Sequence, residues 1–128
     1  MKKIITSLFI IAIVCIVTNS CNPSDGDTHE IAFEIVETDN GKTFQAEIND
    51  QFNIALNEYI GGAEVWTINK LDSSKISLEQ RTSRDRSCTN CDGGSLTRVF
   101  RFKCLQKGLS DLELRYFDDT LKATINIQ

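Results

Sequence analysis

From residue 31 to the end of the chain, apolar and polar residues alternate in short runs separated by turn signals, and this pattern limits the fold more than any other feature. Alternation with a period of two is typical of β-strands that bury one face. The breaks carry turn-forming residues, as at Asp39-Asn40-Gly41 and Gln106-Lys107-Gly108. No window shows a sustained helical period. The sequence therefore predicts an all-β domain, an antiparallel sandwich or barrel of roughly eight strands.

The individual runs set the expected strands. They cover residues 31–36, 44–48, 52–56, 63–69, 76–78, 96–104, 112–116 and 121–127. Apolar residues on one parity of each run are expected to form the core, and Trp66 is expected among them with its N–H near an edge. The segment from Arg81 to Gly94 is predicted to be a long polar loop that ends in glycines.

The N-terminus has the pattern of a secretory signal. Met1-Lys2-Lys3 precedes an apolar run over residues 4–17, which is shorter than the roughly 20 residues that a membrane-spanning helix needs. Thr18-Asn19-Ser20-Cys21 follows, so the whole segment resembles a bacterial lipoprotein signal. The resemblance implies that residues 1–20 are removed and that Cys21 carries the lipid. The chain would then be lipid-anchored in the bacterial cell envelope, in the periplasm or exposed at the surface. A plain cleaved signal and an uncleaved anchor are the alternatives.

The rest of the chain is acidic and suffices for one domain. Residues 21–30 are small, polar and acidic, and we expect them to be a flexible tether ahead of a domain over residues 31–128. Removing residues 1–20 takes away Lys2 and Lys3 and no acid, so the formal net charge of −4 becomes −6. Such a domain without a basic cluster is a poor candidate for binding nucleic acid or anionic membranes. Membrane attachment would come from the lipid on Cys21.

Three cysteines, Cys88, Cys91 and Cys104, remain after the signal and the lipidated residue are set aside. A structural disulfide that fixes the long loop is the favoured interpretation, either within Cys88-Thr89-Asn90-Cys91 or to Cys104. A redox pair would need a helix after the first thiol, and here Asp92-Gly93-Gly94 and a predicted strand follow. A zinc site would lack a fourth ligand, so no metal is expected.

The sequence offers no set of catalytic residues. The one histidine, His29, lies in the expected tether, which argues against a Ser/His/Asp system and also against a metal site there. The carboxylates are scattered and mostly at solvent-facing positions, so a general acid/base pair is not evident. We therefore expect a protein that is not an enzyme and needs no cofactor.

One segment stands out as an exposed loop. Asn57-Glu58-Tyr59-Ile60-Gly61-Gly62 lies between two predicted strands and combines polar residues, an aromatic residue and two glycines. This composition suits a displayed loop better than a core strand. An ordinary surface turn is the alternative interpretation.

Three loops together resemble those of the chagasin-type inhibitors of papain-like cysteine proteases. The family's first loop carries Asn-Pro-Thr-Thr-Gly followed by an aromatic residue, and Asn57-Glu58-Tyr59-Ile60-Gly61 and Trp66 stand at the corresponding place. The family's Gly-x-Gly-Gly in the second loop corresponds to Cys91-Asp92-Gly93-Gly94. Its Arg-Pro-Trp in the third corresponds to Arg115-Tyr116-Phe117. The resemblance covers residues 41–128.

The resemblance implies an immunoglobulin-like antiparallel β-sandwich of about eight strands, whose three loops at one end enter the protease cleft. Small residues such as Gly61 and Gly62 let a backbone approach a catalytic cysteine closely, and Tyr59 would be an aromatic anchor. The implied partner is a papain-like cysteine protease of the same cell or of a host. The inhibitor is expected to be a monomer.

Differences from the family motifs support a second hypothesis. The first loop lacks the family's Pro and both Thr, Cys91 replaces the first glycine of the second, and the third loop lacks Pro and Trp. In this hypothesis the same sandwich is a non-catalytic binding or assembly module of the cell envelope with decayed inhibitory loops. A third hypothesis is a thiol carrier that uses Cys88 and Cys91.

Overall fold

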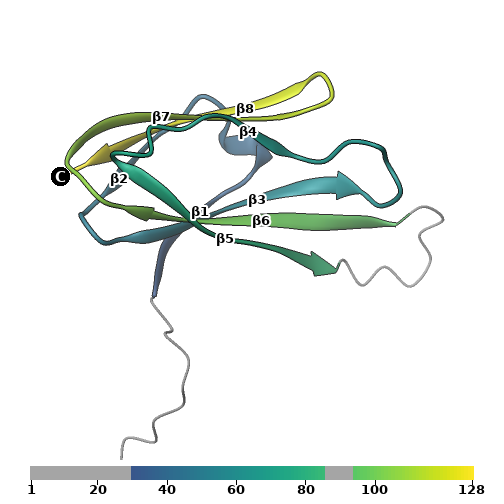
Figure 1. Cartoon of the computed structure of the whole chain (residues 1–128), viewed down its shortest axis with the longest axis horizontal. Coiled ribbons are helices and arrows are strands. Elements are labelled where there is room, and N and C mark those ends of the chain that lie inside the picture. Colours follow the sequence, from purple (N-terminus) through teal and green to yellow (C-terminus); the bar gives the residue numbers. More distant parts are fainter. Residues whose placement is uncertain (1–29, 86–93) are drawn as a thin grey trace, which may run out of the picture.

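The computed structural model describes residues 30–85 and 94–128, which form eight strands and one short 3-10 helix. The strands are β1 (Ile31–Ile35), β2 (Thr43–Ala46), β3 (Gln51–Tyr59), β4 (Thr67–Lys70), β5 (Ile76–Asp85), β6 (Ser95–Cys104), β7 (Gly108–Tyr116) and β8 (Asp119–Ile127), and the helix is η1 (Glu37–Asp39). Two four-stranded sheets, β1-β3-β6-β5 and β2-β8-β7-β4, make up the sandwich (Figure 1). The predicted all-β sandwich of about eight strands is confirmed.

Two edge strands are paired in parallel, which the sequence did not indicate. β1 runs parallel to β3, and β2 runs parallel to β8, whereas the other neighbours are antiparallel. The chain leaves the first sheet after β1, turns through η1 and enters the second sheet as β2. The segment from β1 to β2 therefore supplies an edge strand to each sheet, and η1 connects these two strands.

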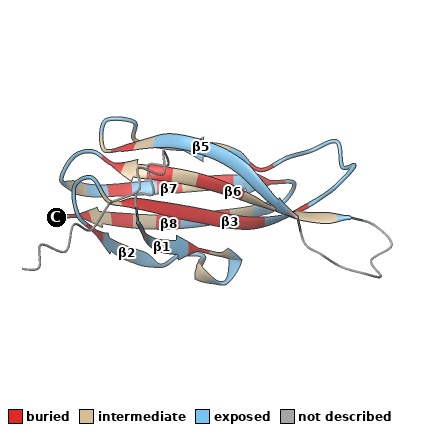
Figure 2. Cartoon of the chain, turned by 90° about the horizontal axis from the view of Figure 1, so that it is seen from below, coloured by how far each residue is buried: buried red, intermediate tan, exposed pale blue. Residues whose placement is uncertain are grey.

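The core lies between the two sheets, and it follows the predicted alternation on β7 and β8, whereas β3 is buried at every position from Gln51 to Leu56. Residues of one parity are buried along β7 and β8, with Leu112, Leu114 and Ile125 as examples. A row of stacked rings begins at Phe44 on β2 of the second sheet and continues across the first sheet through Phe33, Phe52 and Phe102. Neighbouring ring centroids are 5.0–5.4 Å apart. Figure 2 shows burial concentrated on β3, β6, β7 and β8, with β5 largely exposed. Apolar burial of this kind is the main force that holds such a sandwich together.

The segment predicted as a loop from Arg81 begins as strand. β5 continues to Asp85 and pairs with β6 in register, for example Arg81 with Phe100 and Arg84 with Thr97. Polar composition suggested a loop, but β5 is an edge strand with solvent on its free side, where polar residues are common. β4 differs in the opposite sense, because it begins at Thr67 and residues 63–66 lie outside any strand.

Several predicted features lie outside the described residues. These are the signal peptide, the lipidated Cys21, the tether up to residue 29, and Cys88, Cys91, Asp92 and Gly93. Cys104 is described and is a buried free thiol, so the alternative in which it forms the disulfide is not found. Over residues 30–85 and 94–128, no helix has the length and apolarity that a membrane span requires.

Candidate functional site

The β3–β4 and β7–β8 connections (the first and the third), the end of β5 and the start of β6 with Gly94 (from the second) lie at one end of the sandwich, which we call the loop end (Figure 1). The N–H of Ile60 donates to the carbonyl of Gly94 over 2.7 Å, which joins the first connection to the second. The N–H of Tyr59 donates to the Tyr116 hydroxyl over 3.2 Å. This bond joins the first connection to the last residue of β7, after which the third connection begins. The structure thus brings together those predicted loop residues that it describes.

The first connection presents an exposed tip. Tyr59 and Ile60 are 71% and 57% exposed, and Asn57, Gly61 and Gly62 are exposed as well. Gly61 has a φ of +87°, a left-handed conformation that side chains with a Cβ rarely adopt, and no heavy atom lies within 4 Å of where its Cβ would stand. The tip therefore has a tight turn with open space around its glycine.

Glu58 was predicted as a displayed loop residue, but the structure places it inside the protein. β3 continues to Tyr59, so Glu58 shares the inward parity of Leu56 and is only 3% exposed. Its carboxylate accepts hydrogen bonds from Arg98 Nη2 over 2.5 Å and from Arg98 Nε over 3.2 Å. The N–H of Trp66 donates to the same carboxylate over 3.1 Å. Glu58 therefore holds the first connection in place from the interior of the sandwich.

The charge state of Glu58 follows from these partners. Burial raises the pKa of its carboxyl, but the Arg98 hydrogen bond, the Trp66 N–H and the charges of Arg98 and Arg81 outweigh burial and hold that pKa below its usual value. The pKa of Arg98 is raised in turn, mainly by its hydrogen bond to Glu58. The pair is thus ionised at neutral pH.

Aromatic rings also support the loops from the interior of the loop end. Trp66 is buried, as predicted, and its indole N–H donates to the Asn57 carbonyl over 2.7 Å. Its ring stacks on Tyr116 with centroids 5.3 Å apart. Tyr116 was predicted to contact a partner, yet it is only 5% exposed, because it has inward parity on β7. The guanidinium of Arg81 lies 4.8 Å above the Phe100 ring and donates to the Trp66 carbonyl.

The third connection is the two-residue turn Phe117-Asp118 between β7 and β8. Phe117 is 48% exposed and has a φ of +49°, an uncommon and strained conformation for a bulky residue. Its ring meets the Tyr116 ring edge-on, with centroids 4.8 Å apart. Arg115 Nε donates to the Phe117 carbonyl over 3.3 Å, so the exposed Arg115 side chain holds the turn.

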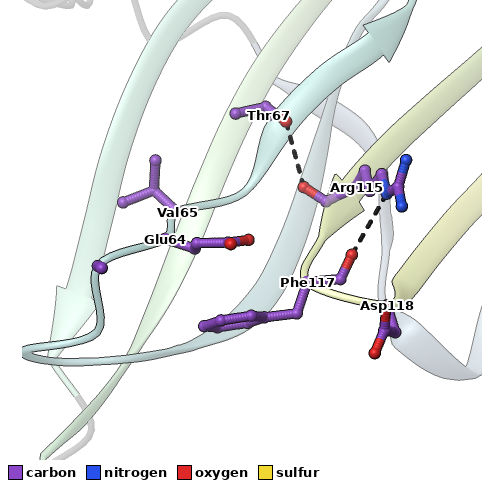
Figure 3. A pocket seen from close by; sticks show the side chains of 7 residues that line it. Glu64, Val65, Thr67, Arg115, Phe117 and Asp118 are labelled. Atoms are coloured by element: carbon purple, nitrogen blue, oxygen red, sulfur yellow. Dashed lines mark hydrogen bonds between the residues drawn. The ribbon is translucent and has the colours of Figure 1, made fainter.

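An open groove of about 590 Å³ separates this turn from the first connection (Figure 3). Glu64 and Val65 line one side, and Arg115, Phe117 and Asp118 line the other. Val65 and Phe117 are about half exposed, and the charged Glu64, Arg115 and Asp118 share the lining, so the groove has mixed polar and apolar walls. Surfaces that bind other proteins contain both apolar and polar groups of this kind.

Gly94 is the described part of the second connection. A Cβ on Gly94 would lie 2.9 Å from Ile60 Cδ1, so a side chain there would push against the first loop. Sequence reasoning missed Arg98 and Arg81 as supporting residues. Arg98 shares the parity of Leu96 and Phe100, but its partner on β3 is identified only by the strand register. For Arg81 the sequence contained no signal, because a register irregularity between Leu78 and Gln80 reverses the parity of β5.

Metal binding and thiol chemistry find no support in the described residues. They contain no group of three or more His, Cys, Asp or Glu that could hold a metal ion. Burial and the charge of Asp50 raise the pKa of the Cys104 thiol to about 11, so this thiol is protonated and unreactive at neutral pH.

No protein-family model and no curated protein matches the sequence. Solved structures do match. The chain is similar to the cysteine protease inhibitor EhICP2 from Entamoeba histolytica, with 19% identity and a TM-score of 0.68 over 77% of this chain and 100% of that one. The chain shares the fold of a cysteine protease inhibitor.

Two further solved structures have the same fold. Amebosin matches with 15% identity and a TM-score of 0.63, over 75% of this chain and 97% of its own. PbICP-C, solved in complex with falcipain-2, matches with 12% identity and a TM-score of 0.55, over 79% of this chain and 93% of its own. At these identities the likeness concerns the fold, and the function rests on the site.

Proposed function

We propose that this chain is a monomeric, lipid-anchored inhibitor of papain-like cysteine proteases rather than an enzyme. The observation that carries the proposal is the joining of three connections at one end, through the Ile60–Gly94 and Tyr59–Tyr116 hydrogen bonds. The fold shared with EhICP2 and with PbICP-C supports it. Loops held by a stiff body lose little entropy when they bind, so more of the contact energy appears as affinity.

The structure revises which residues would meet the protease. Tyr59 and Ile60 would provide apolar contacts at the first tip, and Gly61 would let the backbone approach the catalytic cysteine. Phe117 and Arg115 would contact the protease from the third connection. Glu58, Trp66 and Tyr116 would hold these residues in place from the interior. Asp92 and Gly93 remain predicted contacts.

Lipid anchoring through Cys21 is the second part of the proposal. It rests on the basic start, the short apolar run and the cysteine at its end. The anchor would keep the inhibitor in the bacterial cell envelope.

The test is a titration of papain with the soluble chain from residue 22 onward. Stoichiometric inhibition at micromolar chain is expected. The variant Gly61→Leu should lose inhibition, because it places a bulky side chain on the tip. The matched control is Gly41→Leu, because Gly41 also has a left-handed φ, +83°, with no heavy atom near its Cβ position. Both variants should lose about 1–2 kcal/mol of stability, but only the first should lose inhibition. Equal inhibition by the two variants would count against the proposed site.

A second candidate function is a non-catalytic binding module of the cell envelope. The observation that favours it is the brevity of the Phe117-Asp118 turn, which has only two residues between β7 and β8. A pull-down with immobilised chain distinguishes the two functions. The module should recover envelope proteins and no protease, whereas the inhibitor should recover a cysteine protease.

A further inference from the structure

The sandwich has two ends with different exposed apolar groups. Among the described residues, the large exposed apolar side chains of the loop end are Tyr59, Ile60, Val65 and Phe117. Three others, Ile48, Leu105 and Leu109, lie at the opposite end. Ile48 lies in the β2–β3 connection, Leu105 follows β6, and Leu109 is the second residue of β7. We call this opposite end the base.

Pairing registers place these residues together at the base. The N–H of Asn49 donates to the Cys104 carbonyl over 2.9 Å, which joins the β2–β3 connection to the end of β6. The N–H of Gln128 donates to the Ala46 carbonyl over 2.9 Å, so the end of β8 also lies there. Leu109 is opposite Asn126 of β8. The three aliphatic side chains therefore belong to one end of the molecule.

The chain enters the domain at the base. Ile31, the first residue of β1, pairs with Gln51, the first residue of β3, and the two strands are parallel. β3 then runs to Tyr59 at the loop end. With a rise of about 3.3 Å per residue, the nine residues of β3 separate the two ends by roughly 25–30 Å. The entry point of the chain and the loops thus lie at opposite ends.

The segment that leads to a lipid on Cys21 is short. It comprises the ten residues from Cys21 to Glu30, which span at most about 35 Å when fully extended. A random coil of this length has a root-mean-square extension of about 18 Å. A lipid on Cys21 would therefore hold the base close to the bilayer.

From these observations we propose that the base, with Ile48, Leu105 and Leu109, rests on the lipid bilayer and that the loops point away from it. The inference rests on the proposed lipid anchor. Aliphatic side chains are suited to contact with the acyl boundary of a bilayer. Charged residues in the connections at the base carry both signs, namely Lys75 and Lys107 and the acids Glu47, Asp50 and Asp72. The contact therefore does not depend on anionic lipid. A protease would be captured with its cleft opening directed toward the membrane.

The single tryptophan allows a direct test, because Trp66 lies at the loop end. The full chain would be expressed in bacteria, purified from membranes and reconstituted into phosphatidylcholine vesicles that contain a dansyl-labelled lipid. Energy transfer from Trp66 to the dansyl group should be weak. The variant Leu109→Trp adds a second donor at the base, and its additional emission should be transferred several-fold more strongly. Leu109 is 63% exposed, so the change does not disturb the core.

A second set of variants tests the aliphatic contact. Replacing Ile48, Leu105 and Leu109 together by Ser should raise transfer from Trp66, because the domain would lose its fixed orientation. The control replaces the exposed Ile60 by Ser at the loop end, and transfer should stay unchanged. Each of three results would overturn the inference. The first is that the tryptophan added by Leu109→Trp transfers energy no more strongly than Trp66. The second is that the triple change has no effect, and the third is that mass spectrometry finds no lipid on Cys21. Inhibition of papain by the soluble chain is measured separately, so failure of the proposed inhibitory function can be distinguished from failure of the proposed orientation on the bilayer.

Discussion

The buried pair of Glu58 and Arg98 provides the sharpest test of how the loop end is held together. In Glu58→Gln the side chain keeps its shape and loses its charge, so Arg98 loses its ionic partner. Removing one partner of a fully buried pair costs about 3–5 kcal/mol. The Arg98 side chain is 22% exposed and regains some hydration, so we expect a smaller loss of about 2–3 kcal/mol in the free energy of unfolding.

The chain contains a matched control for this change. Glu34 also accepts two hydrogen bonds from one arginine, Arg84, over 3.1 and 2.8 Å. Its side chain is 34% exposed and that of Arg84 is 54% exposed. Exposed pairs contribute about 0–1 kcal/mol, so Glu34→Gln should cost less than 1 kcal/mol. Burial is the main difference between the two pairs.

Urea unfolding at pH 7 measures both losses. With a slope of about 1.5 kcal/mol/M, Glu58→Gln should lower the midpoint by roughly 1.3–2 M, and Glu34→Gln by less than about 0.7 M. The Glu58 pKa is lower in the folded state than its ordinary value of 4.5. Its contribution to stability is therefore complete above pH 4.5 and is lost as the pH falls through the folded pKa. The difference between wild type and Glu58→Gln should shrink over that range. Equal losses in Glu58→Gln and Glu34→Gln would refute the reasoning.

Three other outcomes follow from single residues. Tyr116→Phe removes the acceptor for the Tyr59 N–H but keeps the ring, so stability should fall by about 1 kcal/mol and the protease complex should dissociate faster in stopped-flow assays. Ser110→Ala should leave the thermal midpoint unchanged or raise it, because the buried Ser110 hydroxyl has no hydrogen-bond partner among the described residues. With its pKa raised to about 11, Cys104 should react with iodoacetamide at pH 8 only after unfolding, as peptide mass spectrometry would show.

The alternating pattern sufficed to predict the sandwich because strands such as β7 and β8 obey it. Leu112, Leu114 and Ile125 are buried where their parity placed them. The parallel edge strands could not be predicted, because alternation shows which face of a strand is buried and not which neighbour it pairs with. The prediction ended β5 too early, because its polar residues from Arg81 onward occupy a sheet edge. Strand and loop sequences have similar composition at such an edge.

The candidate site was predicted by position more than by role. Tyr59, Ile60 and Phe117 are exposed at the loop end, as expected. Glu58 and Tyr116 are buried at the same end, although their residue types suggested display. A carboxylate at an inward position is normally excluded from a core, and here an arginine on the neighbouring strand makes burial tolerable. A sequence does not reveal such a partner until the register of the strands is known.

Polar interior groups at the loop end connect stability with binding. Glu58 links Arg98 of the central strand β6 to the backbone of Trp66, and Trp66 in turn donates to the Asn57 carbonyl. These contacts restrict both ends of the first connection before any partner arrives. A loop restricted in this way gives up less entropy on binding, so substitutions that touch no partner can still weaken inhibition. Loss of inhibition by Glu58→Gln under conditions where the variant is fully folded would distinguish this role of the pair from simple stabilisation of the fold.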